Sequence, residues 1–137
     1  MTIFDKNKQF VSKVTVRLTN VRMAHDFPLT KNYAVFPDLP IEFSMGHALW
    51  NKSFVFKYNK LGSARYGFLP RYSTNPSDIV WISTPAHCVF HFAAAWEETN
   101  EQGEVLLITY GVVYHDIDVS FQHKPGEHPM MGAKNCF

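Results

Sequence analysis

The sequence contains seven histidines, whose spacing gives the first indication of chemistry. Imidazole nitrogens are common ligands for transition metals, and they also transfer protons near neutral pH. His25 and His91 share a setting, because aromatic and aliphatic residues surround each of them in the sequence. A histidine in a dry site needs a hydrogen-bond partner or a metal ion, since an unsatisfied buried polar group costs about 1–3 kcal/mol. The residues alone leave both interpretations open, and a core histidine bonded to a backbone carbonyl is the commoner case.

His87 and His91 form an H-x3-H pair, which on a helix would place both rings on one face, as in zinc proteases. The surrounding residues have a strand pattern instead, and on a strand the two side chains would lie roughly 13 Å apart. Two ligands of one ion, each about 2.1 Å from it, cannot be so far apart. We therefore expect that these two histidines do not share a metal. Three further histidines are interpreted as solvent-exposed: His115, His123 and His128.

Short strands separated by turns must position these residues. Alternation predicts a strand over residues 14–20, after a hairpin over 4–11, and further strands are predicted at 32–36, 53–58, 78–83, 88–96 and 104–114. Turn residues separate them at 37–40, 61–63, 73–77 and 100–103. Only residues 44–52 favour a helical turn. The predicted fold class is therefore all-β, as an antiparallel sandwich, barrel or propeller.

Composition narrows the class of protein. The chain has 137 residues, of which 46% are hydrophobic and 18% charged, and this balance indicates one globular domain. A net charge of +1 gives no electrostatic reason to expect a nucleic-acid partner. The sequence contains no uninterrupted run of about 18 apolar residues, so it predicts no transmembrane segment. The distant Cys88 and Cys136 favour reduced thiols, so a cytoplasmic compartment is the default expectation.

Four blocks of sequence carry a more specific pattern. "MAHDFPLTKNYAVFPDLP" begins at Met23 and contains H-D-F-x-x-T-x-N-Y, while "FDKNKQFVSKVTV" precedes it. "SARYGFLPR" (63–71) and "DIVWISTPAHCVFHFAAAWEE" (78–98) follow in order. Together these blocks resemble the carotenoid cleavage oxygenases, a family that also holds lignostilbene dioxygenases and retinoid isomerases.

The resemblance implies a seven-bladed β-propeller that carries a non-haem Fe(II) held by four histidines. His25 and His91 match the second and third of these ligands, so it implies an Fe(2+) site at this pair and no catalytic residue beyond the metal ligands. By the same resemblance, residues 1–121 would form roughly two blades of a partial propeller, and 122–137 an irregular tail that does not match the family. An apolar substrate site would be lined by aromatic residues, for which ordinary packing is the competing interpretation: Phe27, Phe90, Phe92 and Trp96.

The implied reaction is oxidative cleavage by O2 of a conjugated C=C bond in a carotenoid, apocarotenoid or stilbene-like substrate. The first and fourth family histidines have no counterpart here, and Ala94 stands where the family usually has Asn. We therefore expect the isolated chain, a fragment of the enzyme, to be inactive. Glu97 and Glu98 match the family's W-E-E pattern without an assigned role. Two alternatives remain: the isomerohydrolase branch of the family, and a non-catalytic β-propeller interaction module. The resemblance is also compatible with peripheral membrane contact in the full-length family.

Overall fold

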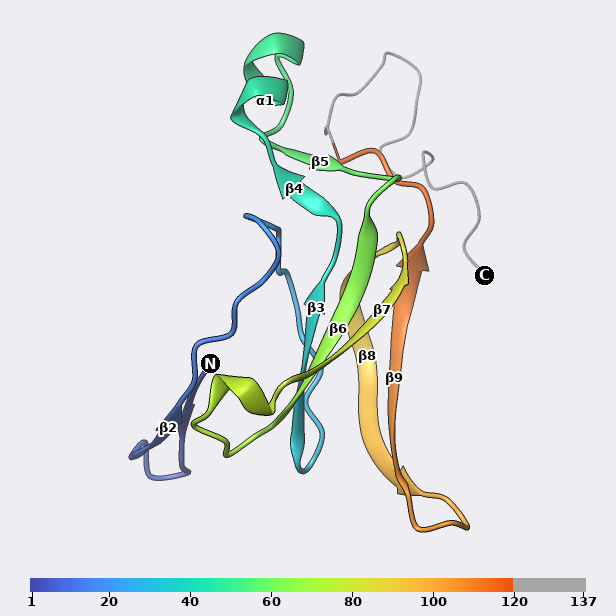
Figure 1. Cartoon of the computed structure of the whole chain (residues 1–137). Helices are drawn as coiled ribbons and strands as arrows, with labels where there is room; N and C mark the ends of the chain where they lie inside the picture. Colours follow the sequence, from blue (N-terminus) through green and yellow to red (C-terminus); the bar gives the residue numbers. More distant parts are fainter. Residues whose placement is uncertain (120–137) are drawn as a thin grey trace.

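The structure, a computed structural model, describes residues 1–119 (Figure 1). The predicted tail at 122–137, with His123 and His128, lies outside the described residues. The described residues are mostly β-strand with little helix, as the predicted fold class requires. The elements are β1 (Thr2–Phe4), β2 (Phe10–Lys13), β3 (Tyr33–Asp38), β4 (Ile41–Phe43), α1 (Met45–Asn51), β5 (Phe56–Tyr58), β6 (Ser63–Pro70), the 3-10 helix η1 (Pro76–Asp78), β7 (Val80–Pro85), β8 (Cys88–Thr99) and β9 (Val105–Tyr114).

The strands form separate antiparallel sheets. β3, β6 and β7 make a three-stranded sheet with β6 at its centre, while β1–β2, β4–β5 and β8–β9 are two-stranded. In Figure 1 the long β8–β9 hairpin lies beside the β3–β6–β7 sheet, and α1 caps the end that carries β4 and β5. Among the described residues these sheets do not close into a propeller.

The core lies between the β3–β6–β7 sheet and the β8–β9 hairpin. Its centre is made by Leu39, Ala64 and Val89, each at most 5% exposed, with Phe92 packed against them. On β6, Gly67 pairs with Trp81 of β7, and a Cβ at this glycine would lie 2.8 Å from the Trp81 ring. The missing side chain therefore lets the indole ring lie close against β6.

A buried charge network anchors the segment that follows β2. The fully buried carboxylate of Asp38 accepts hydrogen bonds from the Thr19 N–H and hydroxyl, both at 2.8 Å. It also accepts from Arg65 Nε at 2.6 Å and from Arg22 Nη1 at 3.3 Å. Arg65 lies over the Trp81 ring, with its guanidinium carbon 3.9 Å from the ring centroid. Because Thr19 and Arg22 both bond to this carboxylate, Asp38 fixes the course of residues 19–22, which lead to His25.

The strand predicted over residues 14–20 is wrong, because β2 ends at Lys13, Val14 still exchanges hydrogen bonds with Met1, and residues 15–20 pair with no strand of the described chain. Burial still alternates there: Val14 is buried and Val16 half-buried, while Thr15 and Arg17 are exposed. The alternation of apolar residues therefore identified the side of this segment that packs on the core, but a strand also needs a partner strand to form a β-ladder.

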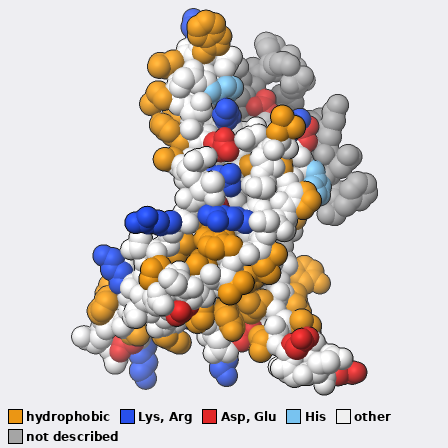
Figure 2. All heavy atoms as spheres, viewed as in Figure 1, with side chains coloured by type: hydrophobic (Ala, Val, Ile, Leu, Met, Phe, Trp, Pro, Cys, Tyr) orange, Lys and Arg blue, Asp and Glu red, His pale blue; other side chains and the backbone are white. Residues whose placement is uncertain are grey.

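The helical turn predicted over residues 44–52 is confirmed as α1. The Ser44 hydroxyl accepts from the His47 N–H at 3.3 Å, and Lys52 ends the helix in the left-handed conformation. Figure 2 shows apolar side chains on the surface over α1, where Leu49 and Trp50 are 75% and 88% exposed. No helix among residues 1–119 reaches the length and apolarity that crossing a membrane requires.

Candidate metal centre

The structure brings His25 and His91 together although 66 residues separate them in the sequence. Their ring centroids lie 4.8 Å apart and the ring planes are nearly perpendicular, at 86°. Phe90 packs its edge against His25 at a centroid distance of 5.8 Å. Both imidazoles are exposed, and neither makes a hydrogen bond to another described residue. Their ring nitrogens are therefore available to a ligand.

Two β-bulges in β8 present His91. Val89 pairs with Val113, Phe92 with Gly111 and Ala94 with Tyr110, so β8 uses extra residues on both sides of Phe92. A bulge leaves a residue outside the ladder and turns its side chain in a new direction. Because of this offset Val89, Phe92 and Glu97 all share the face of β8 that packs on the core, which strict alternation along the sequence would not give. The separation of roughly 13 Å expected for His87 and His91 on a regular strand therefore does not apply to this segment.

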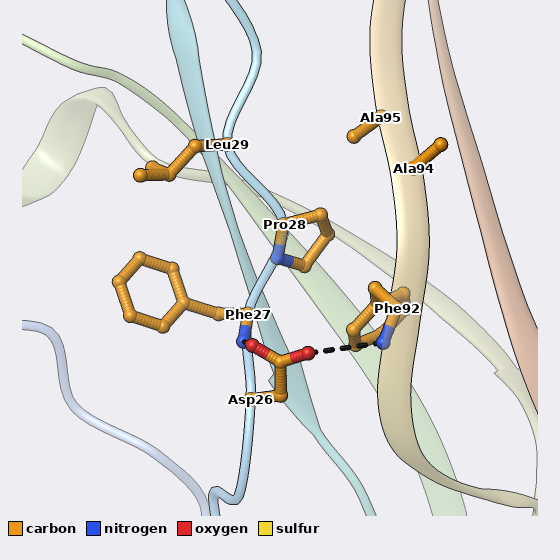
Figure 3. Close-up of a pocket in the computed structure, with 7 residues that line it drawn as sticks. All are labelled: Asp26, Phe27, Pro28, Leu29, Phe92, Ala94 and Ala95. Carbon is orange, nitrogen blue, oxygen red and sulfur yellow. Dashed lines mark hydrogen bonds between the residues drawn. The ribbon is translucent and has the colours of Figure 1, made fainter.

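Asp26 connects the segment that carries His25 to β8. We call residues 23–32 the His25 segment. The Asp26 carboxylate accepts from the Phe27 N–H at 2.8 Å and, from across the site, the Phe92 N–H at 3.0 Å (Figure 3). The hydrogen bond from Phe92 is the main reason that the pKa of Asp26 is held below its usual value. A charged carboxylate thus lies next to His25 in the sequence and joins the backbones beside both histidines.

Glu97 makes a second connection farther along β8. Its carboxylate accepts from the Thr30 hydroxyl at 2.5 Å, from the Asn32 N–H at 2.7 Å and from the Asn32 side-chain amide at 2.7 Å. These bonds, with Thr30 the largest cause, lower the pKa of Glu97. Arg71 donates to the Thr30 carbonyl oxygen at 3.0 Å. The H-D-F, L-P-R and W-E-E blocks of the sequence therefore meet at one junction.

His87 has a different role from His91. Its Nε2 lies 2.6 Å from the Tyr66 hydroxyl and its Nδ1 lies 2.8 Å from the Pro85 carbonyl oxygen. The carbonyl can only accept, so Nδ1 carries the proton and Nε2 accepts from the tyrosine. Burial raises the pKa of Tyr66 to about 12, which keeps this donor protonated. With both nitrogens engaged, His87 is a packed core histidine.

A pocket of about 220 Å³ lies between the His25 segment and β8 (Figure 3). Of the four aromatic residues predicted to line a substrate site, Phe27 and Phe92 line this pocket, whereas Phe90 and Trp96 do not. Trp96 stacks on Tyr110 at a centroid distance of 5.4 Å. The pocket-lining residues are Asp26, Phe27, Pro28, Leu29, Phe92, Ala94 and Ala95.

The pair of histidines fits part of a metal site. Two nitrogens that share one ion lie at most about 4 Å apart, since each is about 2.1 Å from it. Rings with centroids 4.8 Å apart can meet this condition. Residues 1–119 contain no group of three or more His, Cys, Asp or Glu side chains that could hold a metal ion. Among the described residues, at most these two imidazoles could therefore reach one common ion.

Comparison with known proteins gives the family. The profile of the retinal pigment epithelial membrane protein (RPE65) family matches residues 1–134. The chain belongs to this family, which includes the carotenoid cleavage dioxygenases, and the resemblance inferred from the sequence blocks is confirmed.

Among curated relatives, the chain is 38% identical over 107 residues to carotenoid 9,10(9',10')-cleavage dioxygenase 1 of Phaseolus vulgaris, which covers 78% of this chain and 19% of the relative. It is 34% identical over 117 residues to the protein of the same name from Pisum sativum, which covers 85% of this chain and 21% of the relative. The chain thus spans about a fifth of the length of these relatives.

A solved structure shares the fold. The lignostilbene dioxygenase of Pseudomonas brassicacearum matches with a TM-score of 0.59 over 80% of this chain and 28% of its own, at 16% identity.

Proposed function

We propose that this chain is part of a non-haem Fe(II) dioxygenase that oxidatively cleaves a conjugated C=C bond of a carotenoid, apocarotenoid or stilbene-like substrate. The observation that carries the proposal is the meeting of the His25 and His91 imidazoles, 4.8 Å apart, in a chain of this family. Curated relatives are carotenoid cleavage dioxygenases, and the related solved structure is a lignostilbene dioxygenase. Carotenoids and stilbenes both contain conjugated double bonds.

In this proposal His25 and His91 hold Fe(II) through ring nitrogens. Imidazole is a suitable ligand for ferrous iron, which when bound supplies the activation of O2. Asp26 holds the backbones next to both rings together, so their spacing does not depend on the ion alone. Phe27 and Phe92 provide an apolar wall beside the site, suited to a hydrocarbon substrate and to the exclusion of water.

The remaining parts of the proposed site lie outside the described residues. The resemblance implies four histidine ligands, of which His25 and His91 would be two, and residues 1–119 contain no group of three or more possible ligands. It also implies that the sheets seen here are about two blades of a seven-bladed propeller, in keeping with a chain that spans about a fifth of its relatives. Alone, two histidines would bind iron weakly, and we expect the 137-residue chain to lack turnover.

Anaerobic titration with Fe(II), followed by calorimetry, tests the proposal on the whole chain. The wild type should bind one ion, and His25→Ala and His91→Ala should each weaken binding by about tenfold or more. His47→Ala is the matched control, because His47 lies in α1 and bonds to Asn51. Equal binding by all four proteins would contradict the assignment of the two histidines and favour a non-catalytic module.

A further inference from the structure

The position of His25 relative to His91 depends on few interactions. The second half of the His25 segment is tied to β3, since the Val35 N–H donates to the Pro28 carbonyl oxygen at 3.0 Å. His91 belongs to β8, which is in a different sheet from β3. No backbone ladder joins these two sheets in the described chain. Besides the apolar packing of Phe90 on His25 and of Phe92 on the core, side-chain hydrogen bonds between the His25 segment and β8 are therefore the directional contacts that can set the distance between the two rings.

The structure provides two such connections, one near each end of the segment. Asp26, directly after His25, bonds to the N–H of Phe92, directly after His91. Glu97 bonds to Thr30 and Asn32, in the turn before β3. The two anchor points, Phe92 and Glu97, pair with Gly111 and Leu107 of β9, so they lie four ladder positions apart, about 13 Å along the strand. A segment held at one point can pivot, whereas a segment held at two separated points cannot.

The second connection is built as a specific acceptor site. Glu97 uses both carboxylate oxygens to accept three hydrogen bonds, and Arg71 holds the same turn through the Thr30 carbonyl oxygen. Hydrogen bonds to a carboxylate are about twice as strong as neutral ones. The neighbouring Glu98 makes no such contact, because it accepts from the Trp96 indole N–H at 2.6 Å.

We propose that Glu97, together with Asp26, is a positioning residue that sets the separation of the His25 and His91 rings by clamping the His25 segment to β8. The functional role of this clamp rests on the proposed function, but the hydrogen bonds that form the clamp are present without a metal ion. Glu97 lies six residues beyond His91, and its hydrogen bonds go to Thr30 and Asn32 rather than to either ring. Its effect would act through the backbone of residues 26–32.

NMR with selectively labelled histidines tests the clamp without metal. In the wild type, rings with centroids 4.8 Å apart should give a through-space NOE between His25 and His91. Glu97→Gln removes the charge and replaces one acceptor oxygen by an amide at constant size, so the NOE should weaken or disappear. Glu98→Gln is the matched control and should leave it unchanged. An undiminished NOE in Glu97→Gln would overturn the proposal.

A second pair of variants addresses the case in which Glu97→Gln fails to fold. Thr30→Val removes one donor to Glu97 while keeping the shape of the side chain, and Thr30→Ser restores the hydroxyl. The valine variant should weaken the NOE and the serine variant should rescue it. Equal spectra for both variants and the wild type would also overturn the clamp.

Fe(II) titration of the same variants separates this inference from the proposed function. If both hold, Glu97→Gln should lower the affinity about 10–100-fold, as for other residues that orient metal ligands. Loss of the NOE in Glu97→Gln, when the wild type binds no Fe(II), would support the clamp and reject the metal site. Normal Fe(II) affinity and a normal NOE in Glu97→Gln, with binding lost in His25→Ala, would support the metal site and reject the clamp.

Discussion

Replacement of Asp38 by asparagine should destabilise the chain more than any surface substitution. The side chain of Asp38 is fully buried and that of Arg22 is 6% exposed, so their ion pair is shielded from water. Arg65, whose side chain is 29% exposed, pairs with the same carboxylate. The Asp38→Asn variant would keep the size of the side chain but leave the two guanidinium groups without their shared counter-charge.

The expected loss follows from the burial of the pair. Removing one partner of a buried ion pair costs about 3–5 kcal/mol, because the other charge stays buried and uncompensated. Arg22 also lies 3.6 Å from Glu42, which would remain as a partner in the variant. We therefore expect a loss near the lower end of this range, about 3 kcal/mol. A folded domain has a total stability of about 5–15 kcal/mol, so the effect is a large share of it.

Urea unfolding followed by tryptophan fluorescence measures this loss. With a slope of about 2 kcal/mol per molar urea, about 3 kcal/mol corresponds to a midpoint lower by about 1.5 M. Glu101→Gln, an exposed glutamate in the β8–β9 turn, is the control and should shift the midpoint by much less. A loss below about 1 kcal/mol in Asp38→Asn would show that the arginines regain water, and would refute the assignment of Asp38 as a buried organising charge.

Three other perturbations test separate parts of the structure. Gly67→Ala should lower the free energy of unfolding by about 1–3 kcal/mol, since the new methyl would clash with Trp81; an unchanged melting temperature would contradict this packing. Burial raises the pKa of Cys88 to about 12, so, with the other cysteine replaced by serine, the native chain should not react with a thiol reagent at about pH 8 and should react once unfolded. The Thr30 hydroxyl and other donors lower the pKa of Glu97, so its contribution to stability should be complete above its ordinary pKa of 4.5 and be lost as the pH falls through the lower native value. Urea unfolding over a pH series should accordingly show the wild type and Glu97→Gln converging in acid, and a constant gap would argue against the charged acceptor.

Local patterns predicted most of the strands, although β6 (Ser63–Pro70) was indicated only by the family resemblance of its sequence block. β8 and β9 were expected over residues 88–96 and 104–114 and are found at Cys88–Thr99 and Val105–Tyr114. β4 (Ile41–Phe43) was not expected, because it follows a proline-rich turn and its three residues are too few to show a period. The strand expected at 14–20 failed for the opposite reason, since its alternation is present but residues 15–20 have no partner strand in the described chain.

The candidate site was predictable only in part. The histidines at positions 25 and 91 were singled out from their apolar surroundings and from the resemblance, and the structure brings them together. Asp26 and Glu97 were not recognised as connections, because they accept hydrogen bonds from donors 66 and 65–67 residues away. The amide that Asp26 uses lies between two bulges, and bulges follow from strand pairing rather than from composition.

The offset that β8 accumulates against β9 has a consequence for changes in chain length. Deletion of Ala93, the extra residue between the Phe92–Gly111 and Ala94–Tyr110 pairs, would remove a bulge and leave the later pairs in register. Deletion of Ala95, in the regular ladder beyond the bulges, would instead move each later residue back by one place and exchange the inner and outer faces of the strand from there on. Trp96 would then take the place of Ala95, and its indole would occupy the pocket beside Phe27. Open space at this site is thus maintained by the count of residues in one strand as much as by their identity.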